Sequence, residues 1–169
     1  MNPFRWSFRA SFAALAIVCM GLLAFAYYSQ FVLHLEPCPL CILQRVALIA
    51  FTLIALIAAA HGPVAGGRRA YGLLAGLAAM IGAGIAGRHV WIQHLPPDQV
   101  PACGPGLDFM LENFPLGKTL TMAFTGSGEC AEVKWRFLGL SMPEWTLAWF
   151  VGLAFVALWL GFRAAPRRA

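Results

Sequence analysis

Charged side chains are scarce in this sequence. Of its 169 residues only 11% are charged, whereas 60% are hydrophobic, and the mean hydropathy is +0.73. Soluble domains carry charge at nearer a quarter of their positions, so this composition excludes an ordinary soluble protein. The sequence also has no basic stripe with interleaved aromatic residues, so its net charge of +5 gives no reason to expect nucleic-acid binding.

Long apolar runs take the place of the missing charge. Four of them are long enough to cross a hydrocarbon core of about 30 Å, and each is expected to be helical because backbone polar groups must be paired in lipid. The predicted fold class is an all-α integral membrane protein, an antiparallel bundle of four transmembrane helices that forms a single domain over residues 1–169. The predicted spans are residues 10–28, 41–60, 69–91 and 144–162.

Acidic residues are confined to two of the segments between these spans. All seven lie in the predicted loops 29–40 and 92–143 or at their edges, whereas arginines flank the opposite ends of the spans. The positive-inside rule then places both termini in the cytoplasm and both acidic loops outside. The absence of buried Asp or Glu inside the spans argues against a cation transporter.

The first apolar run has a second interpretation, a secretory signal peptide. Arg5 and Arg9 precede it, and residues 24–26 (AFA) match a small-residue cleavage site. However, the run is longer than the apolar part of a typical signal peptide, and it ends in two tyrosines at 27–28, as interfacial anchors do. We therefore favour an uncleaved span.

Two further patterns bear on the architecture. Small residues recur at about every fourth position of the third span, which predicts close helix packing. In the second outer loop, apolar residues at helical spacing from Leu107 to Phe114 predict a short helix lying in the membrane interface, ended by Pro115 and Gly117. The small residues are Gly72, Gly76, Ala79, Ala83 and Gly87.

Four of the five cysteines lie in the outer loops or at their edges. Cys38 and Cys41 form a C-x-x-C pair where the second span begins, and Cys103 and Cys130 lie in the second loop. A C-x-x-C spacing fits half of a zinc site, a structural disulfide or a redox dithiol. A closed zinc site commonly has a second closely spaced pair, which is missing here, so we expect no metal. The fifth cysteine, Cys19, lies mid-span and is expected to be a buried apolar residue.

The neighbours of the C-x-x-C pair favour the redox interpretation. If the second helix begins near Cys38, Pro39 takes the first helical position, where its missing N–H costs nothing. Cys41 then lies in the first turn, where the helix dipole favours a thiolate, and Arg45 shares its face. Arg45 either stabilises that thiolate and an anionic oxygen beside it, or snorkels to the headgroups.

Stabilising a thiolate makes the corresponding disulfide a stronger oxidant, which then needs a still better oxidant to restore it. At the edge of the hydrocarbon core the obvious acceptor is a lipid-soluble quinone. The sequence contains no haem or flavin fingerprint that would compete for this role.

Two motifs of this chain resemble the bacterial disulfide bond formation protein B (DsbB) family. One is Cys38-Pro-Leu-Cys41 followed by Arg45, and the other is the stretch from Cys130 to Trp145, CAEVKWRFLGLSMPEW. The resemblance covers essentially the whole chain, with four spans, their orientation and both cysteine pairs in order. The longer stretch is far more specific than a bare C-x-x-C.

This resemblance implies an enzyme of the bacterial inner membrane that reoxidises the periplasmic thiol oxidase DsbA, a thioredoxin-fold protein, and passes two electrons to ubiquinone or menaquinone. It implies that Cys103, paired with Cys130, forms the mixed disulfide with DsbA. Reduced Cys130 then attacks Cys38, and Cys41 becomes the thiolate that contacts the quinone beside Arg45.

Some alternatives stay open at this point. The family's second quinone-side residue, a histidine late in the third span, maps to His89, for which interfacial packing is the other interpretation. The chain is either the general DsbA oxidase or a paralogue that oxidises a dedicated client. A non-enzymatic membrane subunit with structural cysteines is the rival from another class.

Overall fold

Four long helices form the body of the protein in a computed structural model, which describes residues 7–102 and 107–163. They are α1 (Phe8–Phe31), α2 (Pro39–His61), α3 (Ala65–Gln93) and α6 (Met142–Phe162). Each is long and apolar enough to cross a membrane, which confirms the predicted fold class. Each predicted span lies within one of these helices, and most helix ends extend a few residues further.

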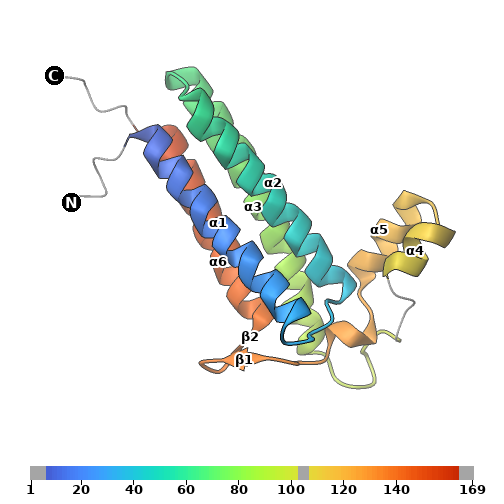
Figure 1. The fold of residues 1–169 in the computed structure, drawn as a ribbon. Helices are drawn as coiled ribbons and strands as arrows, with labels where there is room; N and C mark the ends of the chain where they lie inside the picture. Colours follow the sequence, from blue (N-terminus) through green and yellow to red (C-terminus); the bar gives the residue numbers. More distant parts are fainter. Residues whose placement is uncertain (1–6, 103–106, 164–169) are drawn as a thin grey trace.

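The four helices pack as an antiparallel bundle (Figure 1). In sequence order each packs on the next, α3 and α6 make the most extensive contact, and α6 also touches α1. The start of α1, the α2–α3 turn and the end of α6 lie at one end, which we call the arginine end. The segments that join α1 to α2 and α3 to α6 lie at the other end, which we call the cysteine end.

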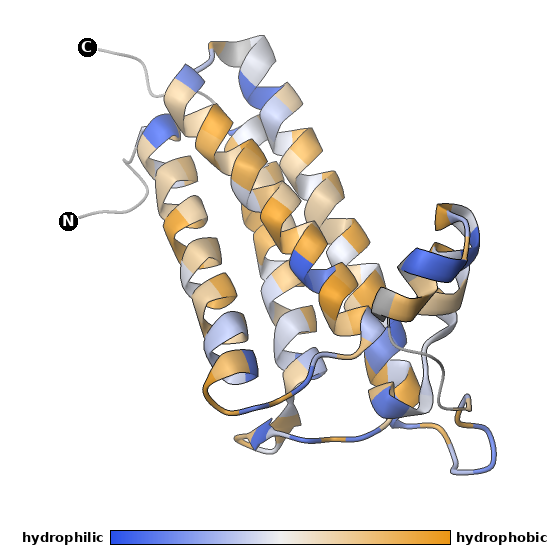
Figure 2. Cartoon of the chain, turned by 45° about the vertical axis from the view of Figure 1, so that its right-hand side comes forward, coloured by the Kyte–Doolittle hydropathy of each residue, from blue (hydrophilic) through white to orange (hydrophobic). Residues whose placement is uncertain are grey.

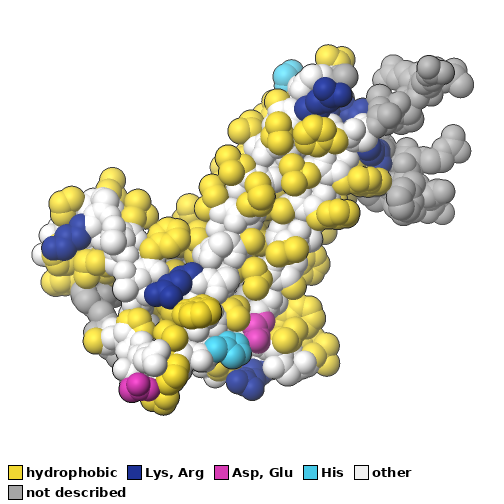
Figure 3. Space-filling model, turned by 180° about the vertical axis from the view of Figure 1, so that it is seen from behind, with side chains coloured by type: hydrophobic (Ala, Val, Ile, Leu, Met, Phe, Trp, Pro, Cys, Tyr) yellow, Lys and Arg dark blue, Asp and Glu magenta, His cyan; other side chains and the backbone are white. Residues whose placement is uncertain are grey.

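The four long helices are built mainly of hydrophobic residues along most of their length (Figure 2). Large apolar side chains lie exposed on them, such as Ile17 (64% exposed) and Phe155 (72% exposed). Such exposure is unfavourable in water but not in the lipid of a membrane. On the face drawn in Figure 3, acidic side chains lie toward the cysteine end, whereas the arginine end carries only basic ones. The exposed apolar side chains and the separation of charge between the two ends both indicate a multi-pass membrane protein.

The contact between α3 and α6 depends on glycine. A Cβ placed on Gly72 would lie 2.7 Å from the Cα of Gly161 and 3.0 Å from the carbonyl oxygen of Ala157, so the two backbones meet with no side chain between them. Gly76 instead makes room for the Leu158 side chain, whose Cδ2 atom would lie 2.8 Å from an added Cβ. The predicted ridge of small residues is thus confirmed at these positions, whereas Gly87 has no neighbour within 4 Å of such a Cβ.

The second outer loop contains more structure than the sequence predicted. Its elements are α4 (Leu107–Asn113), α5 (Leu116–Thr125), the 3-10 turn η2 (Gly128–Cys130), and the antiparallel hairpin of β1 (Arg136–Phe137) and β2 (Leu140–Ser141). The predicted helix corresponds to α4. The expectation that Gly117 ends it was wrong, because Pro115 precedes a new helix and Gly117 lies in its first turn. The Thr119 hydroxyl donates to the Met110 carbonyl oxygen (3.0 Å) and ties α5 to α4.

The glycine contact leads to a first prediction. Gly72→Ala should destabilise the bundle by about 1–3 kcal/mol, because the new methyl group forces α3 away from the α6 backbone. Gly84→Ala on the same helix is the matched control, since nothing lies within 4 Å of its added Cβ. Unfolding of the purified protein in mixed micelles measures both, and equal stability of the two variants would contradict the close contact.

Candidate functional site

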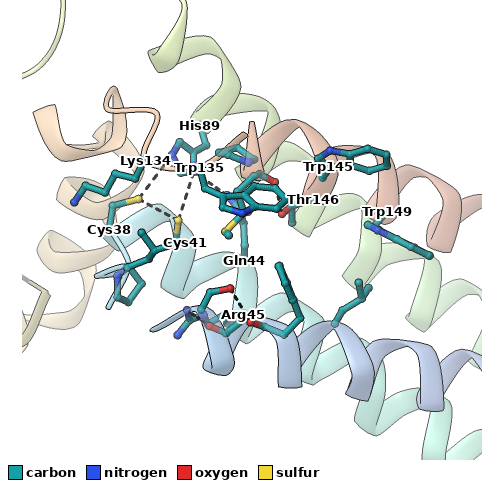
Figure 4. Close-up of a pocket in the computed structure, with 18 of the residues that line it drawn as sticks. Cys38, Cys41, Gln44, Arg45, His89, Lys134, Trp135, Trp145, Thr146 and Trp149 are labelled. Atoms are coloured by element: carbon teal, nitrogen blue, oxygen red, sulfur yellow. Dashed lines mark hydrogen bonds between the residues drawn. The ribbon is translucent and has the colours of Figure 1, made fainter. Parts of the chain in front are cut away.

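The C-x-x-C pair lies at the start of α2, as predicted. Cys38 is the N-cap residue, Pro39 takes the first helical position and Cys41 lies in the first turn. The two sulfur atoms are 3.3 Å apart, and both residues are free thiols in the structure (Figure 4). Cys38 is buried, and Cys41 is partly exposed.

His89, on the last turns of α3, lies against both sulfurs. Its Nε2 atom is 3.8 Å from Cys38 Sγ and its Nδ1 atom is 3.9 Å from Cys41 Sγ. Gln44, one turn after Cys41, donates its amide N–H to Nδ1 (3.1 Å). With Nδ1 accepting, the proton of the neutral ring lies on Nε2, which donates to the carbonyl oxygen of Cys130 (3.2 Å).

The Cys130 side chain is packed into the same place from the second outer loop. It forms a small buried cluster with Cys38 and with Leu40, Ile85 and Ile92 of α2 and α3, and it is only 1% exposed. The Cys38 side chain beside it is the main cause that raises the pKa of the Cys130 thiol, and burial adds to the effect. A cysteine 92 residues away along the chain is thus the immediate neighbour of the C-x-x-C pair.

Arg45 is held by α1 at the edge of this cluster. Its guanidinium donates to the carbonyl oxygen of Ala26 (3.0 Å) and to the side-chain oxygen of Gln30, and it lies 5.2 Å from the centre of the Tyr27 ring. These contacts hold the Arg45 side chain against α1 instead of letting it extend toward the lipid headgroups. The side chain therefore lies on the wall of the cavity described next.

A cavity of about 390 Å³ opens beside the cysteines, between the four helices and the loop that precedes α6 (Figure 4). Most of its wall is apolar and aromatic. The residues already described (Cys38, Cys41, Gln44, Arg45 and His89) face it, and further polar side chains on its lining are Ser29, Glu36, Gln93, Glu129, Glu132, Lys134 and Thr146.

The hairpin and the start of α6 form the outer wall of the cavity. Trp135 contacts Phe25 of α1 edge-on, with ring centres 6.0 Å apart, and stacks on Phe137. The indole N–H of Trp145 donates to the Phe137 carbonyl oxygen (3.0 Å), and the Ser141 N–H donates to the Glu144 carboxylate (2.6 Å). The hairpin is thereby fixed to α6 and closes the cavity from the loop side.

Comparison with known proteins assigns this arrangement to a family. The family profile for disulfide bond formation protein DsbB matches residues 8–160, which include all four long helices except the tip of α6. The chain belongs to the DsbB family. It is therefore a disulfide-forming oxidoreductase of the membrane.

Individual relatives agree over nearly the whole chain. A disulfide bond formation protein B from Xanthomonas campestris pv. campestris (strain 8004) is 53% identical over 170 residues, covering 99% of each chain. The protein of that name from Nitrosococcus oceani is 56% identical over 155 residues, with 92% of this chain and 89% of the relative covered. That from Saccharophagus degradans is 52% identical over 159 residues, covering 94% and 96%.

Of the residues predicted for this DsbB-family site, the structure brings five together: Cys38, Cys41, Arg45, His89 and Cys130. Cys103 lies outside the described residues. Cys19 is fully buried in the bundle core, in agreement with its expected packing role.

Sequence reasoning missed Gln44 and the hairpin wall. Gln44 offered a signal, since a buried amide inside an apolar span needs a partner, and that partner is His89. The wall residue Trp135 lay within the family-like stretch, but nothing in its spacing indicated a ring that faces α1.

The environment of Cys130 leads to a second prediction. In fully reduced protein, Cys130 should be alkylated slowly near neutral pH, because the thiolate reacts and its pKa is raised. Cys38→Ala should lower that pKa and move the pH–rate profile of Cys130 toward lower pH, since it removes the main cause of the shift. Peptide-resolved mass spectrometry of iodoacetamide labelling measures the profile.

Cys19→Ala is the matched control, because it removes a buried thiol that is not part of the cluster around Cys130. Its Cys130 profile should equal that of the unaltered protein. A profile that does not respond to Cys38→Ala would show that the two thiols do not interact.

Proposed function

We propose that this protein oxidises a periplasmic, DsbA-like thioredoxin-fold protein and transfers the electrons to a membrane quinone. The observation that carries the proposal is the position of Cys130. A loop cysteine lies buried against Cys38, and the partner of Cys38 faces an apolar cavity that also contains a guanidinium group. Such a series of sulfurs suits the transfer of a disulfide from the edge of the membrane to a client outside it.

In the first exchange, a thiolate of the client attacks Cys103 of the Cys103–Cys130 disulfide, and Cys130 leaves as a thiol. The second thiol of the client then attacks the mixed disulfide, which releases the oxidised client and a reduced Cys103. Two electrons and one proton thus pass from the client to the loop cysteines, and the solvent supplies the second proton.

In the second exchange, the Cys130 thiolate attacks Cys38 of the Cys38–Cys41 disulfide, and Cys41 leaves as a thiolate. Attack of Cys103 on Cys130 re-forms the loop disulfide and releases Cys38. Because the pKa of Cys130 is raised, its thiol must lose a proton before or during the attack on Cys38. The raised pKa therefore slows disulfide exchange by Cys130 with other partners.

The residues around the cavity fit a quinone ring. Its aromatic and aliphatic walls suit a flat apolar molecule, while Arg45 and Gln44 offer N–H groups to carbonyl oxygens on the side where Cys41 lies. A guanidinium carries five N–H groups, and the contacts with α1 use two of them. A quinone bound there supplies a two-electron, two-proton acceptor. Ubiquinone and menaquinone both meet this description.

For this relay both cysteine-bearing loops must face the periplasm, with the two termini in the cytoplasm of a bacterial inner membrane. The charge distribution supports that orientation. Arg9, Arg68, Arg69 and Arg163 lie at the arginine end of the bundle, and the acidic residues of the described chain lie at or beyond the cysteine end.

A third prediction concerns the electron exit. Purified protein should reoxidise a reduced DsbA-like client only when quinone is supplied, and Cys41→Ser should abolish this turnover, because the Cys38–Cys41 disulfide can then no longer form. The redox state of the client is followed over time by the client's intrinsic aromatic fluorescence or by titration of its free thiols. Cys19→Ser should retain full activity, and turnover that survives Cys41→Ser would rule out the proposed exit.

The identity of the client can be tested separately. Cys130→Ser leaves Cys103 without its partner, so a mixed disulfide formed in cells should persist and can be isolated. Recovery of a general DsbA-type oxidase supports the proposal, whereas recovery of one dedicated protein would favour the paralogue alternative.

A fourth prediction concerns Arg45. Arg45→Ala should raise the apparent quinone KM by about tenfold or more, since a hydrogen bond to a charged group contributes about 1.5–3 kcal/mol. Both disulfides should still form, as judged by thiol counting after oxidation. Arg69→Ala, at the opposite end of the bundle, is the matched control, and an unchanged quinone KM in Arg45→Ala would contradict the assigned role.

A further inference from the structure

Two thiols and an imidazole converge at the cavity wall, and this combination has a use besides sulfur exchange. Cys38 Sγ, Cys41 Sγ and a ring nitrogen of His89 all lie within 4.8 Å of one another. From the sequence we expected no metal, because Cys103 and Cys130 are not closely spaced and the histidines form no paired motif that would complete a set of zinc ligands. The fold supplies the third ligand instead from α3, 48 residues beyond Cys41.

The distances come close to those around a single ion. Two thiolates and an imidazole on a tetrahedral zinc ion, with bonds of ~2.3 Å to sulfur and ~2.05 Å to nitrogen, lie about 3.8 Å (S to S) and about 3.6 Å (S to N) apart. The observed separations are 3.3 Å between the sulfurs, 3.8 Å from Cys38 Sγ to Nε2 and 3.9 Å from Cys41 Sγ to Nδ1, so each sulfur lies closest to a different ring nitrogen. Counted with one ring nitrogen, the three ligand atoms all lie within 4.8 Å of one another. A shift of about 1 Å, made by a small rotation of the His89 ring or of one cysteine side chain, therefore brings a single nitrogen and both sulfurs to the spacing of a zinc site.

The surroundings of His89 already suit a metal ligand. A ligating histidine usually donates its second ring N–H to an oxygen, which fixes the ring. If Nδ1 binds the ion, Nε2 keeps its hydrogen bond to the Cys130 carbonyl oxygen. If Nε2 binds it, the Gln44 amide lies beside Nδ1, and rotation of this amide presents its oxygen.

Charge indicates which ion fits. Two thiolates and one divalent cation form a neutral unit, which suits a cavity with a largely apolar wall. Zn²⁺ meets this requirement, prefers sulfur and nitrogen ligands, and tolerates a fourth position occupied by water. All three ligands line the cavity, so that fourth position has room.

We propose that the reduced Cys38–Cys41 pair, together with His89, binds one Zn²⁺ ion and is thereby held out of the redox cycle. Binding displaces two protons from the two thiols and moves no electrons. The oxidised pair has no thiolates and does not bind the ion. Zinc therefore acts on the dithiol state alone, and it competes with both re-formation of the Cys38–Cys41 disulfide and exchange with Cys130.

The test uses the full-length protein in detergent or nanodiscs, reduced, freed of reductant and kept without oxygen. Titration with Co²⁺ should give about one equivalent of a tetrahedral thiolate complex, seen as sulfur-to-cobalt charge transfer and visible ligand-field bands, and Zn²⁺ should displace it. Oxidised protein should show neither signal.

Variants assign the ligands. Cys41→Ser should abolish the signal, and His89→Ala should weaken Co²⁺ binding by about tenfold or more, since even the loss of a residue that only supports a ligand costs 10–100-fold. His94→Ala is the matched control, because this exposed histidine lies near the same end of α3 but outside the cluster. The double variant Cys103→Ser with Cys130→Ser should retain the complex.

Equal binding by the oxidised protein, or by a folded His89→Ala variant, would overturn the inference, as would loss of the signal in the double variant. The optical titration needs no quinone, so it is independent of the proposed function. Absence of a complex would leave the thiol oxidase proposal standing, and a complex in a protein that fails to turn over would leave this inference standing.

Discussion

His89 is the residue on which the arrangement at the cysteine end depends. Its ring is only 3% exposed, and in such an apolar setting an imidazole without partners would cost several kcal/mol. Both ring nitrogens are paired, one with Gln44 of α2 and the other with the backbone of Cys130. One side chain of α3 therefore joins α2 to the loop, and this junction brings Cys130 against Cys38.

Hydropathy predicted the four helices well because the requirement behind it is purely physical. A polypeptide that crosses lipid must pair its own backbone groups, and only helices of the observed length do so here. Helix ends were predicted less well, since caps rather than apolar content set them. The α1 helix starts at Phe8 because the Ser7 hydroxyl accepts the Ala10 N–H, a contact that lies outside the apolar run. Pro39, by contrast, marked the start of α2 directly.

The hairpin wall was beyond the reach of sequence reasoning for a specific reason. Its turn places Leu138 at φ 51° and Gly139 at φ 83°, so two successive residues adopt positive φ. Asparagine or aspartate before glycine is the usual signal for such a turn, and leucine is not. The turn is stabilised instead by hydrogen bonds between the hairpin and α6, through Trp145 and Glu144. Similarly, the meeting of His89 with Cys38 depends on how α2 and α3 are rotated against each other, which spacing along one helix does not report.

The same electrostatic constraint governs both uses of the cysteine pair. A disulfide is neutral and suits an apolar cavity, whereas each thiolate formed there adds a negative charge that must be compensated. Arg45, fixed by α1 at the cavity wall, offers one positive charge, which matches the single thiolate released when Cys38 is attacked. A second thiolate exceeds what Arg45 alone compensates, and a proton or a bound metal cation can balance it. The relay forms one thiolate at a time, whereas binding of a divalent ion uses two thiolates. The number of thiolates at the cavity thus distinguishes two states of the cysteine pair: one thiolate continues the relay, and two thiolates can bind a metal ion.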